Sequence, residues 1–149
     1  MQNFFFLLET LRKYPPVPVL NRECTKEWQV PDSDLILERG TDIIIPVKGF
    51  HYDPQYYPEP DKFIPERFSA ENVTKSYAKM PFLPFGDGPR NCIGLRMGKM
   101  QTKVGLTMLL RDFKFDLAGN TLKPIVYEPS GFLLTPEGGI QLKVTHRKK

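Results

Sequence analysis

The segment that most constrains this chain is Phe85–Gly94, which reads FGDGPRNCIG and contains one of the two cysteines. Its glycines and its proline favour a tight turn that approaches other groups closely. A helix is predicted directly after this turn, because apolar residues recur there at intervals of three and four, the period of one helical face. These apolar residues are Ile93, Met97, Met100, Val104 and Met108. Cys92 therefore stands at a helix N-terminus, where free N–H groups and the helix dipole favour a thiolate.

A thiolate held by a rigid loop suits a soft or redox-active metal. One cysteine does not make a zinc site, and His51 and His146 are too scattered to complete one, but one cysteine suffices as the axial ligand of a haem. Arg90, two residues before Cys92, is placed to bind an anionic group such as a haem propionate. The alternative is that Cys92 is a buried structural thiol, the usual state of a free cysteine. Cys24 lies far away in the sequence, so both cysteines are expected to be free thiols in a reducing compartment.

The loop resembles the haem-binding loop of the cytochrome P450 monooxygenases, whose pattern is Phe-x-x-Gly-x-Arg-x-Cys-x-Gly. Every fixed position of that pattern is filled in this chain. The resemblance implies that the Cys92 thiolate is the axial ligand of the haem iron and that Arg90 holds a propionate. The loop residues implied to bind the cofactor are Phe85, Gly86, Gly88, Arg90, Cys92 and Gly94. No further catalytic residue is expected in this chain.

Residues 2–14 predict a helix, because their helix propensity is high and two prolines follow them. Glu9 and Arg12 stand at i and i+3 on one face of this helix. By spacing alone, such a pair is most often a solvated surface pair of little energetic weight. With the Pro-Glu-Arg-Phe segment at residues 65–68, however, the pair resembles the Glu-x-x-Arg helix of the same family. That resemblance implies a buried structural network of Glu9, Arg12 and Arg67.

A small β region is predicted after the first helix. Residues 20–24 read as a strand, and residues 35–37 and 43–45 flank a Glu-Arg-Gly-Thr turn that predicts a β-hairpin. Arg22, on the first strand, reads as an exposed charge from its residue type alone. The family resemblance implies instead that Arg22 binds the second haem propionate.

Residues 53–84 are rich in proline, tyrosine and charge and show no sustained period. Such a composition alone is compatible with disorder. The aromatic residues of the segment indicate a packed irregular structure instead, which resembles the family's meander and would carry Arg67 toward the first helix. A helical turn is expected at residues 47–52. Within it, His51 is expected to form structural hydrogen bonds, because no acid–base partner is near it in the sequence.

Short strands are predicted within residues 113–123 and 124–144, with a tight turn at residues 135–139 before an alternating strand at residues 140–144. In the family that the chain resembles, residues at about 130–134 and at 17–19 line the substrate pocket. The candidate pocket residues are Val17, Pro18, Val19, Gly131, Phe132 and Leu133. The alternative for both segments is ordinary core packing.

Charge gives two indications about partners. The net charge is +4, but Arg147, Lys148 and Lys149 supply three of those charges, so nucleic acid is a weak interpretation. Basic residues also recur at intervals of three and four on one face of the helix after Cys92, namely Arg96, Lys99 and Lys103. This face is either a solvated helix face or a docking patch for an acidic flavoprotein, which in the family is an NADPH-dependent reductase.

Together these features predict an α+β fold in a single partial domain over residues 1–149. The resemblance implies the C-terminal third of the mainly α cytochrome P450 catalytic domain: the Glu-x-x-Arg helix, a small β region, the meander, the cysteine loop, a long helix and a terminal β-hairpin. The sequence of residues 82–86 and 100–106 looks most like that of the insect microsomal members of the family. The resemblance implies, for the full-length form, insertion of one oxygen atom of O2 into small lipophilic substrates.

We expect a fragment that is inactive alone, because the family's distal oxygen-activating helix and membrane anchor are not recognisable in these residues. No apolar run approaches the ~20 residues that span a bilayer, so association with the cytoplasmic face of the endoplasmic reticulum is expected only through an upstream anchor. The alternatives to a monooxygenase are a non-catalytic haem-binding or interaction fragment and a haem-thiolate isomerase.

Overall fold

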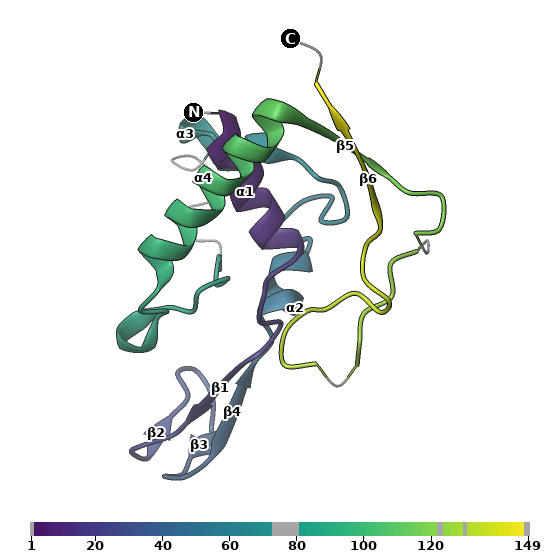
Figure 1. The fold of residues 1–149 in the computed structure, drawn as a ribbon. Helices are drawn as coiled ribbons and strands as arrows, with labels where there is room; N and C mark the ends of the chain where they lie inside the picture. The colour runs from purple at the N-terminus through teal and green to yellow at the C-terminus, as the bar shows by residue number, and fades with distance from the viewer. Residues whose placement is uncertain (1, 73–80, 122–123, 130, 148–149) are drawn as a thin grey trace.

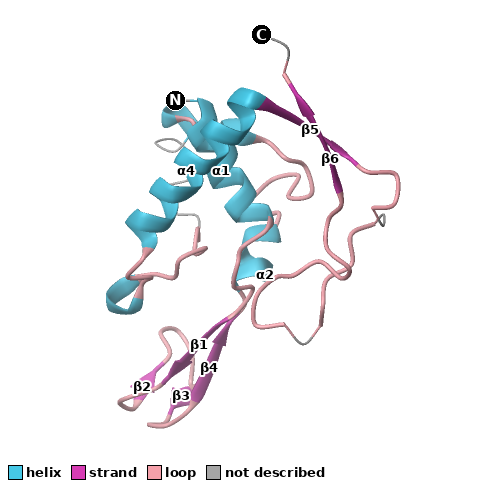
Figure 2. Cartoon of the chain, viewed as in Figure 1, coloured by secondary structure: helices cyan, strands magenta, loops and turns pink. Residues whose placement is uncertain are grey.

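The computed structural model describes residues 2–72, 81–121, 124–129 and 131–147, and it combines helices with small antiparallel sheets (Figures 1 and 2). The predicted α+β class is therefore confirmed. In chain order the elements are α1 (Gln2–Lys13), β1 (Leu20–Glu23), β2 (Trp28–Gln29), β3 (Ile36–Leu37), β4 (Asp42–Ile45), α2 (Val47–Tyr52), the 3₁₀ helix η1 (Pro65–Phe68), α3 (Ala70–Asn72), the 3₁₀ helix η3 (Gly88–Arg90), α4 (Leu95–Asp112), β5 (Phe113–Leu117) and β6 (Leu142–His146).

Helix α1 forms where the sequence predicts it and ends one residue earlier, at Lys13. The amide of Tyr14 still donates to the carbonyl of Thr10 at 2.8 Å, and the helix stops there because the residue before a proline avoids the helical conformation. One face of α1 is buried, and it carries both apolar and charged side chains: Leu7, Leu8, Glu9 and Arg12. The short helix predicted at residues 47–52 is also present, as α2.

The β region differs from the prediction in its pairing. The predicted hairpin between residues 35–37 and 43–45 is wrong, because β3 pairs with β2 and β4 pairs with β1, both antiparallel. The Glu-Arg-Gly-Thr turn does form, with a hydrogen bond of 3.2 Å from the amide of Thr41 to the carbonyl of Glu38. However, Gly40 has a φ of 90° and donates to the carbonyl of Cys24 at 2.7 Å, which directs β4 onto the first strand.

The core lies between α1, α2 and the irregular segment that follows α2. Its apolar part includes Val47, Tyr57 and Phe68, which are all buried. Its polar part consists of charged and hydrogen-bonding side chains that the same segment surrounds. The prediction of a packed irregular segment is confirmed for residues 53–72 and 81–84, while residues 73–80 lie outside the part that the structure describes.

Helix α4 lies across α1 and continues directly into β5, which pairs with β6 in register from Phe113 opposite His146 to Leu117 opposite Leu142 (Figure 1). The turn predicted at residues 135–139 is present, since the amide of Gly139 donates to the carbonyl of Pro136 at 3.1 Å. The last strand begins two residues later than predicted, at Leu142. Pairing with the long β5 sets these bounds, and alternation alone does not specify them.

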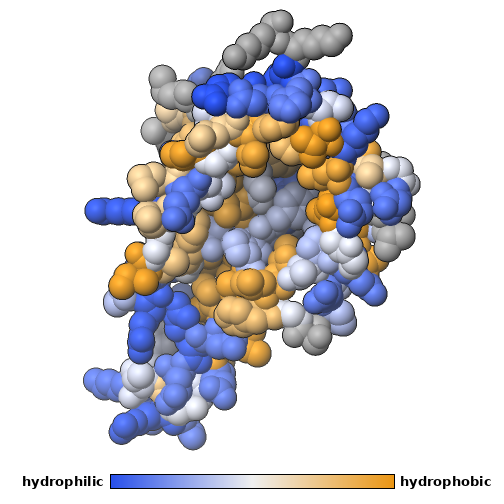
Figure 3. Space-filling model, viewed as in Figure 1, coloured by the Kyte–Doolittle hydropathy of each residue, from blue (hydrophilic) through white to orange (hydrophobic). Residues whose placement is uncertain are grey.

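The predicted apolar face of α4 is present in part, but it is not covered. Met97, Met100 and Val104 are each 54% exposed, and Ile93 precedes the helix and is fully exposed. Figure 3 shows a hollowed face of the molecule with hydrophobic side chains gathered around the hollow. Among the described residues, no helix has the length and apolar character needed to cross a membrane.

Candidate functional site

The segment around Cys92 is a loop closed by its own backbone hydrogen bonds. The amide of Cys92 donates to the carbonyl of Phe85 at 2.8 Å, which joins the two ends of the loop. At its start, the amide of Gly86 donates to the carbonyl of Leu83 at 3.0 Å. Gly86 has a φ of 71°, a value that favours glycine. These hydrogen bonds fix the backbone of the loop that carries the cysteine.

Cys92 presents a free and exposed thiol. The alternative that it is a buried structural thiol is therefore wrong for this structure, whereas Cys24 is a buried free thiol whose Sγ lies 3.0 Å from the carbonyl of Lys26. The helix begins later than predicted, because Gly94 is the N-cap of α4 and the amide of Leu95 donates to the carbonyl of Cys92 at 3.2 Å. The cysteine thus lies just before the first turn of the helix.

The donor set near Cys92 fits a haem better than a bare metal ion. Among the described residues, no group of three or more His, Cys, Asp or Glu side chains could hold a metal ion. A haem brings four nitrogen ligands of its own and needs only one axial ligand from the protein. The exposed thiol at the mouth of a closed loop meets that requirement.

Two arginines lie at the loop. A Cβ added to Gly86 would lie 3.6 Å from Nη2 of Arg22 and 3.8 Å from the carbonyl oxygen of Arg90, so β1 brings the Arg22 guanidinium against the turn. Arg22 is half-buried and donates from Nη1 to the carbonyl of Asn21 at 2.9 Å, and Arg90 is exposed in η3. A loop that contains one arginine and contacts the guanidinium of another suits a cofactor with two carboxylates.

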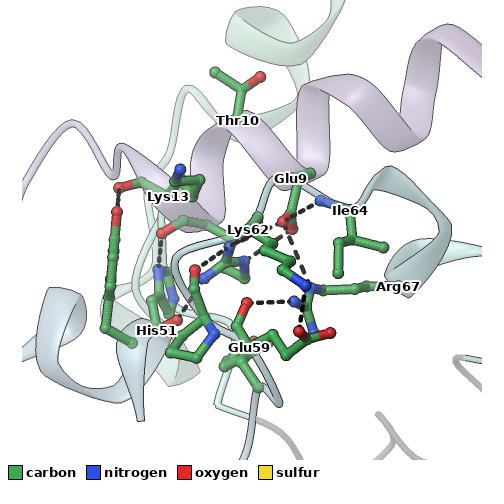
Figure 4. Close-up of polar contacts among 12 residues, drawn as sticks. Glu9, Thr10, Lys13, His51, Glu59, Lys62, Ile64 and Arg67 are labelled. Carbon is green, nitrogen blue, oxygen red and sulfur yellow. Dashed lines mark hydrogen bonds and ion pairs between the residues drawn. The ribbon is translucent and has the colours of Figure 1, made fainter. Parts of the chain in front are cut away.

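The structure brings Glu9, Arg12 and Arg67 together in the core (Figure 4). Arg12 binds the Glu9 carboxylate through two hydrogen bonds of 2.8 Å, from Nε and from Nη2, in the bidentate arrangement that favours such pairs. Arg67 Nε lies 3.5 Å from Oε1 of Glu9, which also accepts a hydrogen bond of 2.9 Å from the amide of Ile64. The side chains of Glu9 and Arg12 are fully buried.

The two guanidinium groups also bind backbone carbonyls. Arg12 donates to the carbonyls of His51 and Pro60, each at 2.8 Å, and Arg67 donates from Nη2 to the carbonyl of Glu59 at 2.8 Å. Arg67 Nε is buried, and within the described part of the chain no acceptor lies in hydrogen-bonding geometry to it. The network therefore joins α1 to the irregular segment. Its charged groups bind one another and backbone carbonyls of the same chain.

His51 lies fully buried beside this network. Its Nδ1 is 3.0 Å from the carbonyl of Arg12, and its Nε2 accepts a hydrogen bond of 2.9 Å from the amide of Leu83. Burial lowers the pKa of His51 to about 4, and the nearby Arg12 charge adds to that effect while the hydrogen bond to the Arg12 carbonyl opposes it. His51 forms structural hydrogen bonds, as predicted, and the structure adds that its ring is neutral. Its two partners are not near it in the sequence, so they were not predicted.

The two candidate pocket segments lie next to each other. The amide of Leu134 donates to the carbonyl of Pro16 at 2.9 Å, and these two residues directly flank residues 131–133 and 17–19. Phe132 is 74% exposed and Leu133 is 52% exposed, so these two side chains are not packed in the described core. Ser130, which the prediction for this segment also covered, lies outside the described residues.

The basic face of α4 contacts aromatic rings on other elements. Nζ of Lys99 lies 5.4 Å from the centre of the Phe85 ring, and Nζ of Lys103 lies 4.0 Å from the centre of the Phe4 ring. Arg96 is exposed. The face is therefore close to the cysteine loop at Lys99 and to α1 at Lys103.

Comparisons with known proteins identify the family of this chain. A family model described as Cytochrome P450 matches residues 6–144. From Drosophila melanogaster, "Probable cytochrome P450 6a14" is 54% identical over 138 residues, which cover 93% of this chain and 27% of that protein. "Probable cytochrome P450 6a13" is 52% identical, with 91% and 27% covered, and "Cytochrome P450 6a8" is 49% identical, with 91% and 27% covered. The chain thus spans about a quarter of the length of the curated relatives it matches.

Proposed function

This chain belongs to the cytochrome P450 family, of the type found in insects, and on that premise we propose that it is the haem-thiolate portion of a monooxygenase. The observation that supports the proposal is the exposed Cys92 thiol, held in a closed loop with Arg22 and Arg90 beside it. A bound haem with a thiolate ligand supplies the oxygen chemistry. The residues of this chain ligate the haem, orient it and shape the space above it.

In this proposal each loop residue has a structural task. Cys92 would ligate the haem iron, and the hydrogen bond from its amide to the Phe85 carbonyl fixes the backbone that carries the sulfur. The Arg22 guanidinium approaches the turn at Gly86 and Arg90 lies in the loop itself, so we assign one propionate to each arginine. The buried network of Glu9, Arg12 and Arg67 holds α1 against the irregular segment and touches no substrate. This portion corresponds to the C-terminal part of the family's catalytic domain.

We place the substrate beside residues 17–19 and 131–133, because these segments lie side by side and expose apolar side chains. Exposed Val19, Phe132 and Leu133 favour small lipophilic molecules over charged ones. Gly131 is required at its position, because an added Cβ would lie 2.9 Å from the carbonyl oxygen of Leu133.

We assign the electron donor to the basic face of α4. Lys99 contacts the Phe85 ring of the cysteine loop, so a reductase that docks at Arg96, Lys99 and Lys103 delivers electrons on the thiolate side of the haem. The donor is an NADPH-dependent flavoprotein with an acidic docking surface. The full-length protein acts at the cytoplasmic face of the endoplasmic reticulum membrane, and residues 1–149 alone are inactive.

The ligand assignment is tested by a pair of matched cysteine variants in the full-length, haem-containing protein. Cys92→Ser is expected to abolish the red-shifted Soret band that marks a thiolate-ligated, carbon monoxide-bound ferrous haem. Cys24→Ser is expected to keep that band, because Cys24 is buried in the β region and bonds to Lys26. If Cys92→Ser kept the thiolate band, Cys92 would not be the ligand and the proposed function would lose its basis.

A further inference from the structure

We propose that His51 is a positioning residue for the cysteine loop: its imidazole ties the backbone of α1 to the backbone that leads into the loop, and thereby holds the Cys92 thiol in register with the haem. This inference rests on the proposed haem ligation by Cys92. In this proposal His51 supports the bond between the Cys92 sulfur and the haem iron, in addition to its role in the core.

The hydrogen-bond partners of the ring determine its protonation. The Arg12 carbonyl, 3.0 Å from Nδ1, only accepts hydrogen bonds, so Nδ1 carries the proton and donates. The Leu83 amide only donates, so Nε2 must be unprotonated to accept its hydrogen bond of 2.9 Å. A neutral ring with its proton on Nδ1 is the form that satisfies both partners.

The connection continues from Leu83 into the loop through backbone hydrogen bonds alone. The Leu83 carbonyl accepts from the amide of Gly86 at 3.0 Å, and the Phe85 carbonyl accepts from the amide of Cys92 at 2.8 Å. The amide that His51 holds therefore lies at the base of the turn that carries the thiol. A shift of Leu83 would be passed to Gly86 and to the Phe85–Cys92 bond.

The His51 ring is itself fixed from several sides. Arg12 donates from Nη1 to the His51 carbonyl at 2.8 Å, so the two residues bind each other reciprocally. The Phe82 ring stacks on the imidazole with centroids 5.6 Å apart and planes 19° apart, and Tyr57 contacts it edge-on at 6.1 Å. Buried side chains pack at high density and cannot shift freely, so this ring is fixed relative to α1. A fixed ring in turn fixes the Leu83 amide that it binds.

Substituting His51 by asparagine or by glutamine tests the roles of Nδ1 and Nε2 separately. The Asn side chain places a polar atom near Nδ1 and leaves the Leu83 amide without its partner, whereas the longer Gln side chain can accept at the position of Nε2. A matched control is Val47→Ala on the same short helix, because Val47 is fully buried and its side chain makes no hydrogen bond to the loop. This control lowers stability by cavity formation while leaving the His51 contacts in place.

The experiment compares His51→Asn, His51→Gln and Val47→Ala in the full-length, haem-loaded protein. The first readout is the fraction of the reduced carbon monoxide complex that has the thiolate-type Soret band, measured with the urea midpoint of each variant. The second is amide hydrogen exchange of the peptide that contains residues 83–92. Loss of the buried acceptor at Leu83 in His51→Asn is expected to raise that exchange about tenfold and to reduce the thiolate fraction.

His51→Gln is expected to stay nearer the wild type in both readouts, and Val47→Ala is expected to keep the wild-type thiolate fraction despite its lower midpoint. If His51→Asn kept the wild-type thiolate fraction and exchange rate, the proposal would be overturned. It would also be overturned if Val47→Ala lost the thiolate band to the same extent, because instability alone would then explain the effect. Failure of the proposed function is recognised separately, since Cys92→Ser would then retain the band.

Discussion

At the scale of single residues, the balance of buried charge around Glu9 makes the network fragile. Replacing Arg67 by alanine removes the guanidinium that lies 3.5 Å from the Glu9 carboxylate and the bond to the Glu59 carbonyl. Breaking a buried ion pair by removing one partner typically costs ~3–5 kcal/mol of unfolding free energy. Arg67→Ala is therefore expected to prevent accumulation of folded, haem-loaded protein, which is measured as haem content per purified protein and as the urea midpoint.

The matched control for this substitution is Lys62→Ala. Lys62 forms an ion pair with Glu59, but both side chains are more than half exposed, and exposed pairs contribute about 0–1 kcal/mol. Lys62→Ala is expected to fold and bind haem as the wild type does. A well-folded, haem-replete and inactive Arg67→Ala protein would instead assign Arg67 to the chemistry.

The burial of His51 also predicts a dependence of stability on pH. Its pKa is about 4 in the folded protein and 6.5 when unperturbed, so between these pH values the unfolded chain binds a proton that the folded chain does not. The stabilisation that the neutral His51 ring gives to the folded protein is fully present above pH 6.5. It is lost as the pH falls toward 4. The loss from this group amounts to roughly 3 kcal/mol of unfolding free energy over that window.

Urea unfolding of the full-length protein at several pH values between 4 and 7.5 measures this loss. His51→Gln has no titrating ring at this position, so its unfolding free energy is expected to change less steeply over the same window. Carboxylates titrate in both proteins, and the difference between the two curves isolates the histidine. Parallel curves would contradict the protonation state that we assign to His51.

At the scale of elements, the basic face of α4 is predicted to dock the electron donor. Reversing the charge of Arg96 or Lys99 is expected to slow reduction by the flavoprotein severalfold at low salt, because steering between opposite charges raises association rates. The defect is expected to shrink as the salt concentration rises toward the range in which the Debye length falls below about 10 Å. The measurement is the reduction rate of the haem in stopped flow at several ionic strengths.

A suitable control is Lys26→Glu, which makes the same change in net charge at an exposed position between β1 and β2. In Figure 1 that region lies at the lower tip of the β strands, whereas Arg96 and Lys99 belong to α4. Lys26→Glu is expected to leave the reduction rate unchanged. If Lys26→Glu and Arg96→Glu slowed reduction equally, the effect would come from net charge, and α4 would be only a solvated face.

The elements also show how far the sequence predicts the structure. Helix propensity and two prolines suffice for α1, since the causes of that helix are local. The strand positions at residues 36–37 and 42–45 are predictable, but their pairing is not, because a two-residue partner such as β2 has too little pattern to detect. In the site, Cys92 and Arg90 follow from one short motif. The contacts of His51 lie 39 and 32 residues away, so only the folded chain reveals them.

At the scale of the whole molecule, the distribution of apolar surface has a consequence for stability. The described core is small and includes several charged residues, while about half of each side chain on the apolar face of α4 is exposed. The same holds on the β5–β6 sheet, where Leu117, Leu142 and Val144 are 49–51% exposed. Contiguous apolar surface of this kind favours association over a stable monomer, and it surrounds the hollow in Figure 3.

This surface leads to the prediction about residues 1–149 produced alone. A haem bound at Cys92 would be covered mainly on the thiolate side, and its other face would remain open to water, which promotes side reactions. We expect weak and heterogeneous haem spectra, a broad thermal transition and concentration-dependent association in sedimentation measurements. The same measurements on the full-length protein are expected to give stoichiometric haem and a cooperative transition. A sharp transition, stoichiometric haem and reductase-dependent product formation by residues 1–149 would show that these residues are a minimal catalytic unit.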